Sequence, residues 1–124
     1  MPEQKKTIVA LLSDLMFTAK IQNAAKRVGV DVVFVKSAEE AMAHASENPA
    51  AIILDLNNTA LDPLQAITEL RALKETAGIG LLGYVSHVQT DLKQAALEAG
   101  CDEVMARSAF SHNLPSILKR YAEG

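Results

Sequence analysis

Short apolar runs alternate along the chain with longer segments in which apolar residues recur every three or four positions. The runs occupy residues 7–12, 30–35, 51–54, 79–85 and 102–106. Polar residues seldom interrupt them, which is typical of strands that are covered on both faces of a sheet. The pattern therefore predicts five short, buried strands.

The first two segments between these runs carry signals for helix ends. Gly29, a favoured C-cap residue, ends the first predicted helix. Ser37, followed three residues later by Glu40, forms a capping box that opens the second. The first helix carries an apolar stripe that we expect to face inward: Leu15, Ala19, Ile21, Ala25 and Val28. We also expect at least one of Met16 and Phe17 to lie in the core.

Three more helices are predicted further along the chain. The third opens at Asp62, with Pro63 suited to its first helical position. The fourth spans about residues 90–99, and the last spans about residues 113–121, with Pro115 tolerated in its first turn. The third helix has its own set of inward-facing residues: Leu64, Ile67, Leu70 and Leu73.

Strands that alternate with helices predict an α/β fold, a doubly wound parallel sheet with helices on both faces. Right-handed crossovers leave few strand orders, and we expect the flavodoxin-like order 2-1-3-4-5 with five helices. In such folds, ligands bind beyond the carboxyl ends of the strands, where the order reverses. The residues at these ends are Ser13, Asp14, Asp55, Ser86, His87, Arg107 and Ser108.

Length, net charge and cysteine count limit the kinds of protein that this chain can be. A length of 124 residues suits one domain, so we predict a single domain over residues 1–124 without an output domain. The net charge of −3 argues against nucleic-acid binding. No apolar stretch has the length of a signal peptide or of a membrane helix, so we expect a cytoplasmic protein that does not contact membranes. The single cysteine, Cys101, suits a reducing compartment and is expected to be a small core residue.

Asp55 is the leading candidate for chemistry. It lies where the apolar run 51–54 meets a polar loop. A carboxylate held at the tip of a rigid strand can attack phosphorus and form an acyl phosphate. The alternative is an aspartate that only hydrogen-bonds its own backbone in the loop. Position alone leaves both interpretations open.

The surroundings of Asp55 favour the first interpretation. Several stretches match a known family in order and spacing: Asp55-Leu56-Asn57, Leu61-Asp62-Pro63-Leu64, Leu70-Arg71, Ala38-Glu39-Glu40-Ala41 and Gly100-Cys101-Asp102-Glu103. They resemble the receiver domains of response regulators, the CheY-like family. The resemblance extends from Thr7 to about Tyr121, and it implies a phosphoprotein of two-component signal transduction or a phosphorelay.

The resemblance also implies a role for each matching position. It makes Asp55 the phosphoacceptor, and it places the backbone carbonyl of Asn57 on a divalent metal. Ser86 matches a hydroxyl residue whose Oγ would bind a phosphoryl oxygen. Arg107 stands where the family carries a lysine. The implied metal site consists of Asp14, Asp55 and Asn57.

The acidic pair with which the family holds Mg²⁺ is altered here. Counting back from Gly29 without gaps places Leu12 and Ser13 at the paired positions, and Asp14 falls one place late. A one-residue slip would bring Asp14 into the pair, so both registers stay open at this point. With two carboxylates in place of three, Mg²⁺ binding is expected to be weak.

Further positions depart from the family pattern. Arg107 has a planar guanidinium, which is no simple substitute for a compact ammonium. Ser108 replaces a proline, and Val104 replaces an aromatic residue that takes part in the switch. His87, beside Ser86, either donates a hydrogen bond to a phosphoryl group or alters water access, with a charge that changes between about pH 6 and 7, or is a partly exposed loop histidine without function.

Two versions of a signalling module therefore follow. In the first, the chain is a stand-alone receiver that is phosphorylated on Asp55 by a histidine kinase or a small phosphodonor. In the second, it is a pseudo-receiver that binds partners without phosphorylation. The resemblance implies that the fourth helix, the fifth strand and the last helix together contact a downstream target or form a homodimer.

Two other classes of protein have little support in the sequence. A flavin-binding domain would need a glycine-rich phosphate loop after the first strand, and none is present there. An enzyme would need a nucleophile, a base and a residue that orients the base, and these residues do not supply such a set. We therefore predict a protein that is not an enzyme.

Overall fold

The protein forms a five-stranded parallel sheet with helices on both faces, as a computed structural model that describes residues 7–86 and 90–123 shows. The strand order is β2-β1-β3-β4-β5, so the predicted fold class and order are confirmed. In chain order the strands are Thr7–Leu11, Asp31–Val35, Ala51–Asp55, Gly80–Val85 and Glu103–Ala106. Each begins or ends within one residue of its predicted bounds.

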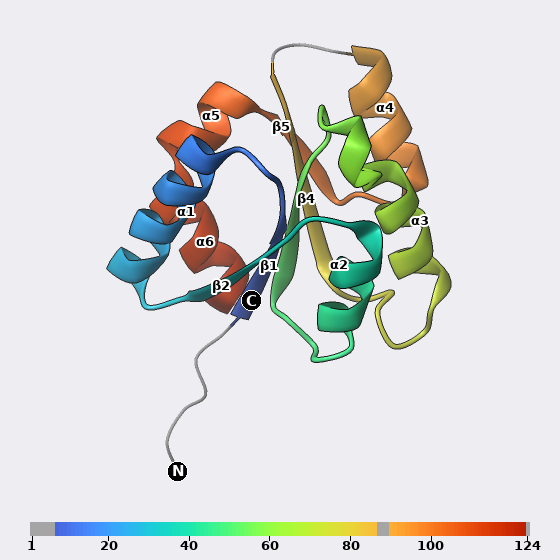
Figure 1. The fold of residues 1–124 in the computed structure, drawn as a ribbon, viewed down its shortest axis with the longest axis horizontal. Coiled ribbons are helices and arrows are strands. Elements are labelled where there is room, and N and C mark those ends of the chain that lie inside the picture. The colour runs from blue at the N-terminus through green and yellow to red at the C-terminus, as the bar shows by residue number, and fades with distance from the viewer. Residues whose placement is uncertain (1–6, 87–89, 124) are drawn as a thin grey trace.

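The helices lie in two layers, one on each side of the sheet (Figure 1). One layer holds α1 (Leu15–Val28), α5 (Arg107–His112) and α6 (Leu114–Glu123), and the other holds α2 (Ala38–Ala45), α3 (Pro63–Ala72) and α4 (Thr90–Ala99). A short 3₁₀ helix, η1 (Thr59–Leu61), connects β3 to α3.

Two apolar clusters fill the space between the sheet and its two helical layers. Successive residues of a strand point to opposite faces. In β1, Ile8 and Ala10 join the cluster under α1 and α6, whereas Val9 and Leu11 join the cluster under α2, α3 and α4. Both clusters are fully buried at the central strands, which makes the carboxyl ends of β1 and β3 a rigid platform.

Local cap signals in the sequence are confirmed. Gly29 has a φ of 72°, in the left-handed region that favours glycine, and its N–H binds the Ala25 carbonyl oxygen. The Ser37 hydroxyl accepts a hydrogen bond from the Glu40 N–H at 3.0 Å. Pro63 is the first residue of α3. Such signals depend on a few neighbouring residues, which is why they can be found in the sequence alone.

The predicted inward face of α1 is partly wrong. The buried residues are Phe17, Ile21, Ala24 and Ala25, at the spacing of one helical face. Leu15 is 80% exposed and Ala19 is exposed as well, because both lie two positions from Phe17 and therefore point away from that face. Phe17 is the core member of the Met16–Phe17 pair, as expected, and Met16 is 75% exposed.

Two further sequence predictions need correction. Leu73 is 46% exposed, because α3 ends at Ala72 and Leu73 has an extended backbone. Five helices were predicted and none was assigned to residues 107–112, but these residues form the extra helix α5, so the described part of the chain contains six α-helices. The residue before α5, Ala106, makes no side-chain capping bond, so this helix has no local start signal. Burial of Phe110 against the sheet stabilises it instead.

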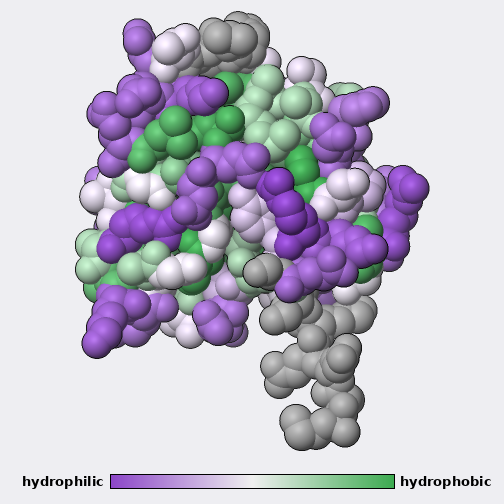
Figure 2. All heavy atoms as spheres, turned by 180° about the vertical axis from the view of Figure 1, so that it is seen from behind, coloured by the Kyte–Doolittle hydropathy of each residue, from purple (hydrophilic) through white to green (hydrophobic). Residues whose placement is uncertain are grey.

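The face opposite to the view of Figure 1 mixes apolar and hydrophilic side chains. Seen from behind (Figure 2), patches of apolar surface are broken up by hydrophilic side chains. Among the described residues, the exposed large apolar side chains are those of Leu15, Met16, Leu73 and Leu97. Within residues 7–86 and 90–123, none of the helices combines the length and the apolar character that crossing a membrane requires.

Candidate functional site

A pocket of about 510 Å³ lies at the carboxyl ends of the parallel strands, where the strand order reverses. It brings together five residues that the sequence places at strand ends, Ser13, Asp14, Asp55, Ser86 and Arg107, together with Asn57 from the β3–α3 loop. Asn58, Thr59 and Ala60 complete its wall. The sequence analysis did not single out these last three residues, although their place directly after Asp55 is a signal that could have found them.

Asp55 is the last residue of β3 and is half-buried. Its Oδ1 accepts a hydrogen bond from the Asn57 N–H at 3.1 Å, which fixes the direction of the carboxylate. Burial raises the pKa of Asp55, and the hydrogen bond from Asn57 and the nearby Arg107 charge lower it in part. The result is a carboxylate that a rigid strand holds at the floor of an open pocket.

The Asn57 side chain connects the β3–α3 loop to the end of β4. Its Oδ1 accepts two hydrogen bonds from Ser86, one from the N–H at 2.5 Å and one from the Oγ hydroxyl at 2.9 Å. Ser86 is exposed at the pocket, as its position after an apolar run indicates. The hydroxyl that was expected to bind a phosphoryl group is therefore engaged by Asn57, and it must change partner to do so.

Asp14 has two tasks in this structure. Its Oδ1 accepts a hydrogen bond from the Phe17 N–H at 3.1 Å and so caps α1, and its Oδ2 pairs with the Arg107 guanidinium at 2.5 Å. The capping bond, followed by the bond from Arg107, lowers the pKa of Asp14. No ion pair or hydrogen bond connects Arg107 to Asp55 among the described residues.

Arg107 is the first residue of α5, and its guanidinium lies over an aromatic cluster. Its guanidinium carbon is 4.7 Å from the centre of the Phe17 ring. Phe17, Tyr84 and Phe110 pack against one another beneath it, with ring centres 4.9 to 5.7 Å apart. Stacking of this kind favours arginine over lysine, because a planar guanidinium covers a ring better than an ammonium group. The cluster therefore explains why arginine suits this position.

The expected metal site fits a divalent cation poorly as the side chains are arranged. Leu12 is buried in the core, and the exposed Ser13 Oγ accepts a hydrogen bond from Asn58 Nδ2 at 2.7 Å. Asp14 is already paired with Arg107, and the described residues include no cation that is bonded to Asp55. Within the described part of the chain, no three His, Cys, Asp or Glu side chains gather as a metal site would require.

The remaining candidates are placed as follows. Val104, at the expected switch position, is 9% exposed and packs in the cluster under α4. Cys101 is buried, as expected, and burial raises the pKa of its thiol. His87 lies outside the described residues. The buried Tyr84 hydroxyl has no hydrogen-bond partner within the described structure, and its pKa is raised by burial.

Comparison with known proteins agrees with this geometry. No family model matches the chain. Over 90 residues, which are 72% of this chain, it is 33% identical to the transcriptional regulatory protein PrrA of Mycobacterium bovis and of Mycobacterium tuberculosis. The chain spans 38% of the length of these relatives.

Solved structures show the same fold. A response regulator from Hahella chejuensis superposes with a TM-score of 0.85 at 16% identity, over 94% of this chain and 95% of that one. The receiver domain of a sensor histidine kinase from Pseudomonas aeruginosa, with magnesium coordinated in its active site cleft, gives 0.82 at 20% identity, over 98% of this chain and all of that one (100%). The fold is therefore that of response-regulator receiver domains.

Proposed function

We propose that this chain is a receiver module of two-component signalling in which Asp55 accepts a phosphoryl group. The observation that carries the proposal is the pocket itself. One half-buried carboxylate lies at the end of β3, and it shares the pocket with a hydroxyl from Ser86 and a guanidinium from Arg107. These are the groups that a transferred phosphoryl group needs: a nucleophile, a hydrogen-bond donor and a positive charge.

The proposed reaction is a transfer to oxygen. A carboxylate oxygen of Asp55 forms a new P–O bond while the P–N bond of a phosphohistidine, or the P–O bond of an acyl phosphate, breaks. The leaving group keeps the electron pair: a phosphohistidine that is protonated on its other ring nitrogen leaves as neutral imidazole, and an acyl phosphate leaves as a carboxylate anion. The histidine or the small phosphodonor is thus released, and Asp55 becomes an acyl phosphate.

Arg107 is the proposed source of positive charge for the product. Its side chain is 40% exposed and that of Asp14 is 37% exposed, so their ion pair is worth about 1 kcal/mol or less. A phosphoryl group with nearly two negative charges can compete for the guanidinium at that cost. Because the arranged donors fit Mg²⁺ poorly, we expect binding of this ion to be weak and the reaction to be slow.

Intact mass after incubation with acetyl phosphate tests this proposal. We expect a slow gain of one phosphoryl group by the wild type, with a rate that changes only a few-fold when Mg²⁺ is replaced by EDTA. Asp55→Asn should abolish the gain, and Asp62→Asn, which changes an exposed carboxylate of the same loop, should leave it unchanged. A steep dependence on Mg²⁺ would contradict the weak metal site and favour Asp14 as a metal ligand.

The second candidate function is a pseudo-receiver that binds partners without phosphorylation. The Asp14–Arg107 pair favours it, because Arg107, the one cation among the described residues that line the pocket, is bonded to Asp14. In this case, the wild type gains no phosphoryl group although circular dichroism shows an intact fold. That result would overturn phosphorylation as the function of the pocket.

In either version we propose that the signal passes to a partner protein. By analogy with the family, the expected contact face is made of α4, β5 and α6, which is the last helix of the sequence prediction. A histidine kinase, a downstream target or a second copy of the chain are the proposed partners. This face stays a proposal until an interface is mapped on it.

A further inference from the structure

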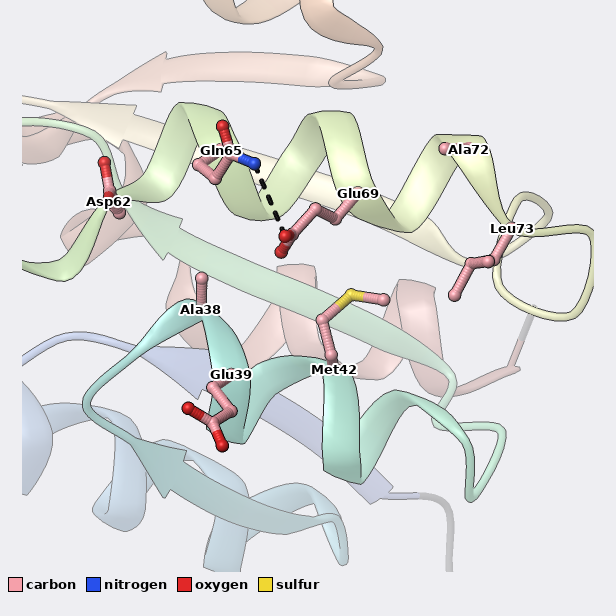
Figure 3. A pocket seen from close by; sticks show the side chains of 8 residues that line it. All are labelled: Ala38, Glu39, Met42, Asp62, Gln65, Glu69, Ala72 and Leu73. Carbon is pink, nitrogen blue, oxygen red and sulfur yellow. Dashed lines mark hydrogen bonds between the residues drawn. The ribbon is translucent and has the colours of Figure 1, made fainter.

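A groove of about 650 Å³ runs between α2 and α3, outside the candidate site. Figure 3 shows the side chains that line it, which come from α2, from α3 and from the residues at either end of α3. They are Ala38, Glu39, Met42, Asp62, Gln65, Glu69, Ala72 and Leu73. A groove of this size holds a few side chains of a bound segment.

The floor of the groove is apolar. Met42 is half-buried and projects from α2 toward α3, and Ala38 and Ala72 leave room on either side of it (Figure 3). Leu73, at one end, is one of the few large apolar side chains on the surface and is 46% exposed. A flexible methionine beside an exposed leucine can adapt to an apolar side chain from another molecule.

The rim of the groove is acidic. Glu39, Asp62 and Glu69 carry negative charge, and none of the lining residues that the structure describes carries positive charge. Asp62, the N-cap of α3, makes no capping hydrogen bond with its side chain, so capping α3 does not occupy its carboxylate. Glu69 accepts a bond from Gln65 at 3.3 Å, which directs it along the groove (Figure 3).

The dimensions suit one short helix. The groove extends along α3 from Asp62 to Leu73, and at about 1.5 Å per residue this corresponds to roughly 16 Å, or three helical turns. An amphipathic helix of that length presents apolar residues on one side and charged residues at its flanks. Apolar anchors would then face Met42 and Leu73, and flanking cations would face the carboxylates.

We propose that the α2–α3 groove binds a cationic amphipathic helix from a partner protein. Charge complementarity identifies the occupant: a rim with three carboxylates and no cation attracts lysine and arginine and repels acidic segments. The apolar floor supplies the anchor, in the helix-in-groove mode of recognition. The proposal does not depend on phosphorylation of Asp55.

The groove is also connected to the candidate site through the backbone. Asp62 ends the segment that begins at Asp55, and it has a φ of 56°, which is unusual for a residue other than glycine. Thr59 and Ala60, in η1 between them, line the phosphoryl pocket. A helix bound at Asp62 therefore contacts the same loop that forms one wall of that pocket.

A designed peptide tests the proposal. The probe is a fluorescent helix of about 14 residues with leucines at positions i, i+3, i+4 and i+7 and lysines elsewhere. We expect it to bind the full chain, with amide cross-peak shifts in an NMR titration confined to α2, α3 and the loop at Asp62. The same peptide with glutamates in place of lysines should not bind.

Matched variants distinguish peptide binding in the groove from attraction of the peptide to the net charge of the chain. Leu73→Asp should weaken binding at least about tenfold, whereas Leu97→Asp, at another exposed leucine, should not. The combined change Glu39→Gln, Asp62→Asn and Glu69→Gln should also weaken binding about tenfold. The control changes three acidic residues outside the groove, with Glu75→Gln, Asp91→Asn and Glu98→Gln, and should have little effect.

Two outcomes would overturn the proposal. The first is equal weakening by the groove variants and their controls, because it would show attraction to net charge alone. The second is concentration-dependent dimerisation of the wild type that Leu73→Asp abolishes, because it would make a second copy of this chain the occupant. Asp55→Asn should leave peptide binding unchanged, so failure of phosphorylation and failure of the groove are distinguishable.

Discussion

At the scale of single residues, the informative feature is the ion pair of Arg107. Its guanidinium pairs with Asp14, the N-cap of α1, whereas none of the cations in the described part of the chain is bonded to Asp55 in the same pocket. Phe17 favours this pairing, because its ring stacks with the Arg107 guanidinium and its N–H holds the Asp14 carboxylate in place. Asp14 thus determines where the cation of the pocket lies.

Asp14→Asn tests this role. Asparagine retains an oxygen for the Phe17 N–H and is as good an N-cap as aspartate, but it loses the charge that holds Arg107. We expect the unfolding free energy to change by less than about 1 kcal/mol and phosphorylation of Asp55 to become faster. The measurement is the rate of phosphoryl gain from acetyl phosphate at several Mg²⁺ concentrations.

A slower phosphorylation of Asp55 in the Asp14→Asn variant would contradict this role of Asp14. If Asp14→Asn slows phosphorylation and removes its dependence on Mg²⁺, Asp14 is a metal ligand and its pairing with Arg107 is secondary. Denaturant unfolding serves as the control, because a large loss of stability would show that the cap had been damaged. Arg27→Gln, an exposed change at the far end of α1, should affect neither quantity.

At the scale of elements, Arg71 of α3 fixes the connections at the amino ends of β4 and β5. Its guanidinium donates to the carbonyl oxygens of Gly100, Ala77 and Ile79 at 2.7 to 2.8 Å, and it pairs with Asp102 at 2.8 Å. Asp102 in turn accepts from the Leu81 N–H at 2.8 Å. One side chain thus joins α3, the α3–β4 loop and the turn between α4 and β5.

Arg71→Lys should therefore be costly although the charge is retained. A lysine has no planar fork of donors and cannot reach three carbonyl groups and a carboxylate together, so the part-buried carbonyl oxygens of Gly100 and Ile79 lose a partner. We expect a loss of about 2 kcal/mol or more in the free energy of unfolding. Urea unfolding followed by circular dichroism measures it.

Arg27→Lys is the matched control for this change, since Arg27 is exposed in the last turn of α1. It should stay within about 0.5 kcal/mol of the wild type. Equal stability of the two lysine variants would contradict the role assigned to Arg71. The resemblance named Arg71 only as part of a motif, and the structure shows what its side chain does.

At the scale of the whole molecule, folding partly buries the charged carboxylate of Asp55, which lowers the free energy of unfolding. Burial raises the pKa of Asp55, so the folded state binds a proton more readily than the unfolded chain does. As pH rises from the ordinary carboxyl value of about 3.9 through the raised pKa, the wild type loses stability from this group. At pH values above the raised pKa, this loss of stability stays constant.

Asp55→Asn removes this cost, because its amide oxygen keeps the bond from the Asn57 N–H without carrying charge. We expect the variant to be more stable than the wild type at neutral pH, by roughly 1 kcal/mol or less because the group is half-exposed. The difference should shrink as pH falls toward about 4. Thermal unfolding at several pH values measures it, and a difference that grows toward low pH would contradict the raised pKa.

Much of the architecture was determined by the sequence itself. Five apolar runs, cap residues such as Gly29 and Ser37, and the alternation of runs and helices defined the strands, their order and most helices. These signals are local, and the rules for crossovers leave few ways to combine them. The position of Asp55 at the end of β3 follows from the same pattern.

Tertiary structure alone decided the rest. The short helix α5 forms because Phe110 packs on Phe17 and Tyr84, residues far away in sequence, and no local signal announces it. The interactions in the pocket, the Arg107–Asp14 ion pair and the hydrogen bond from Ser86 to Asn57, depend on angles and distances between separate elements. The exposure of Leu73 likewise depends on where α3 ends. Periodicity shows which face of an element is apolar, but only the packed structure shows which side chains meet across elements.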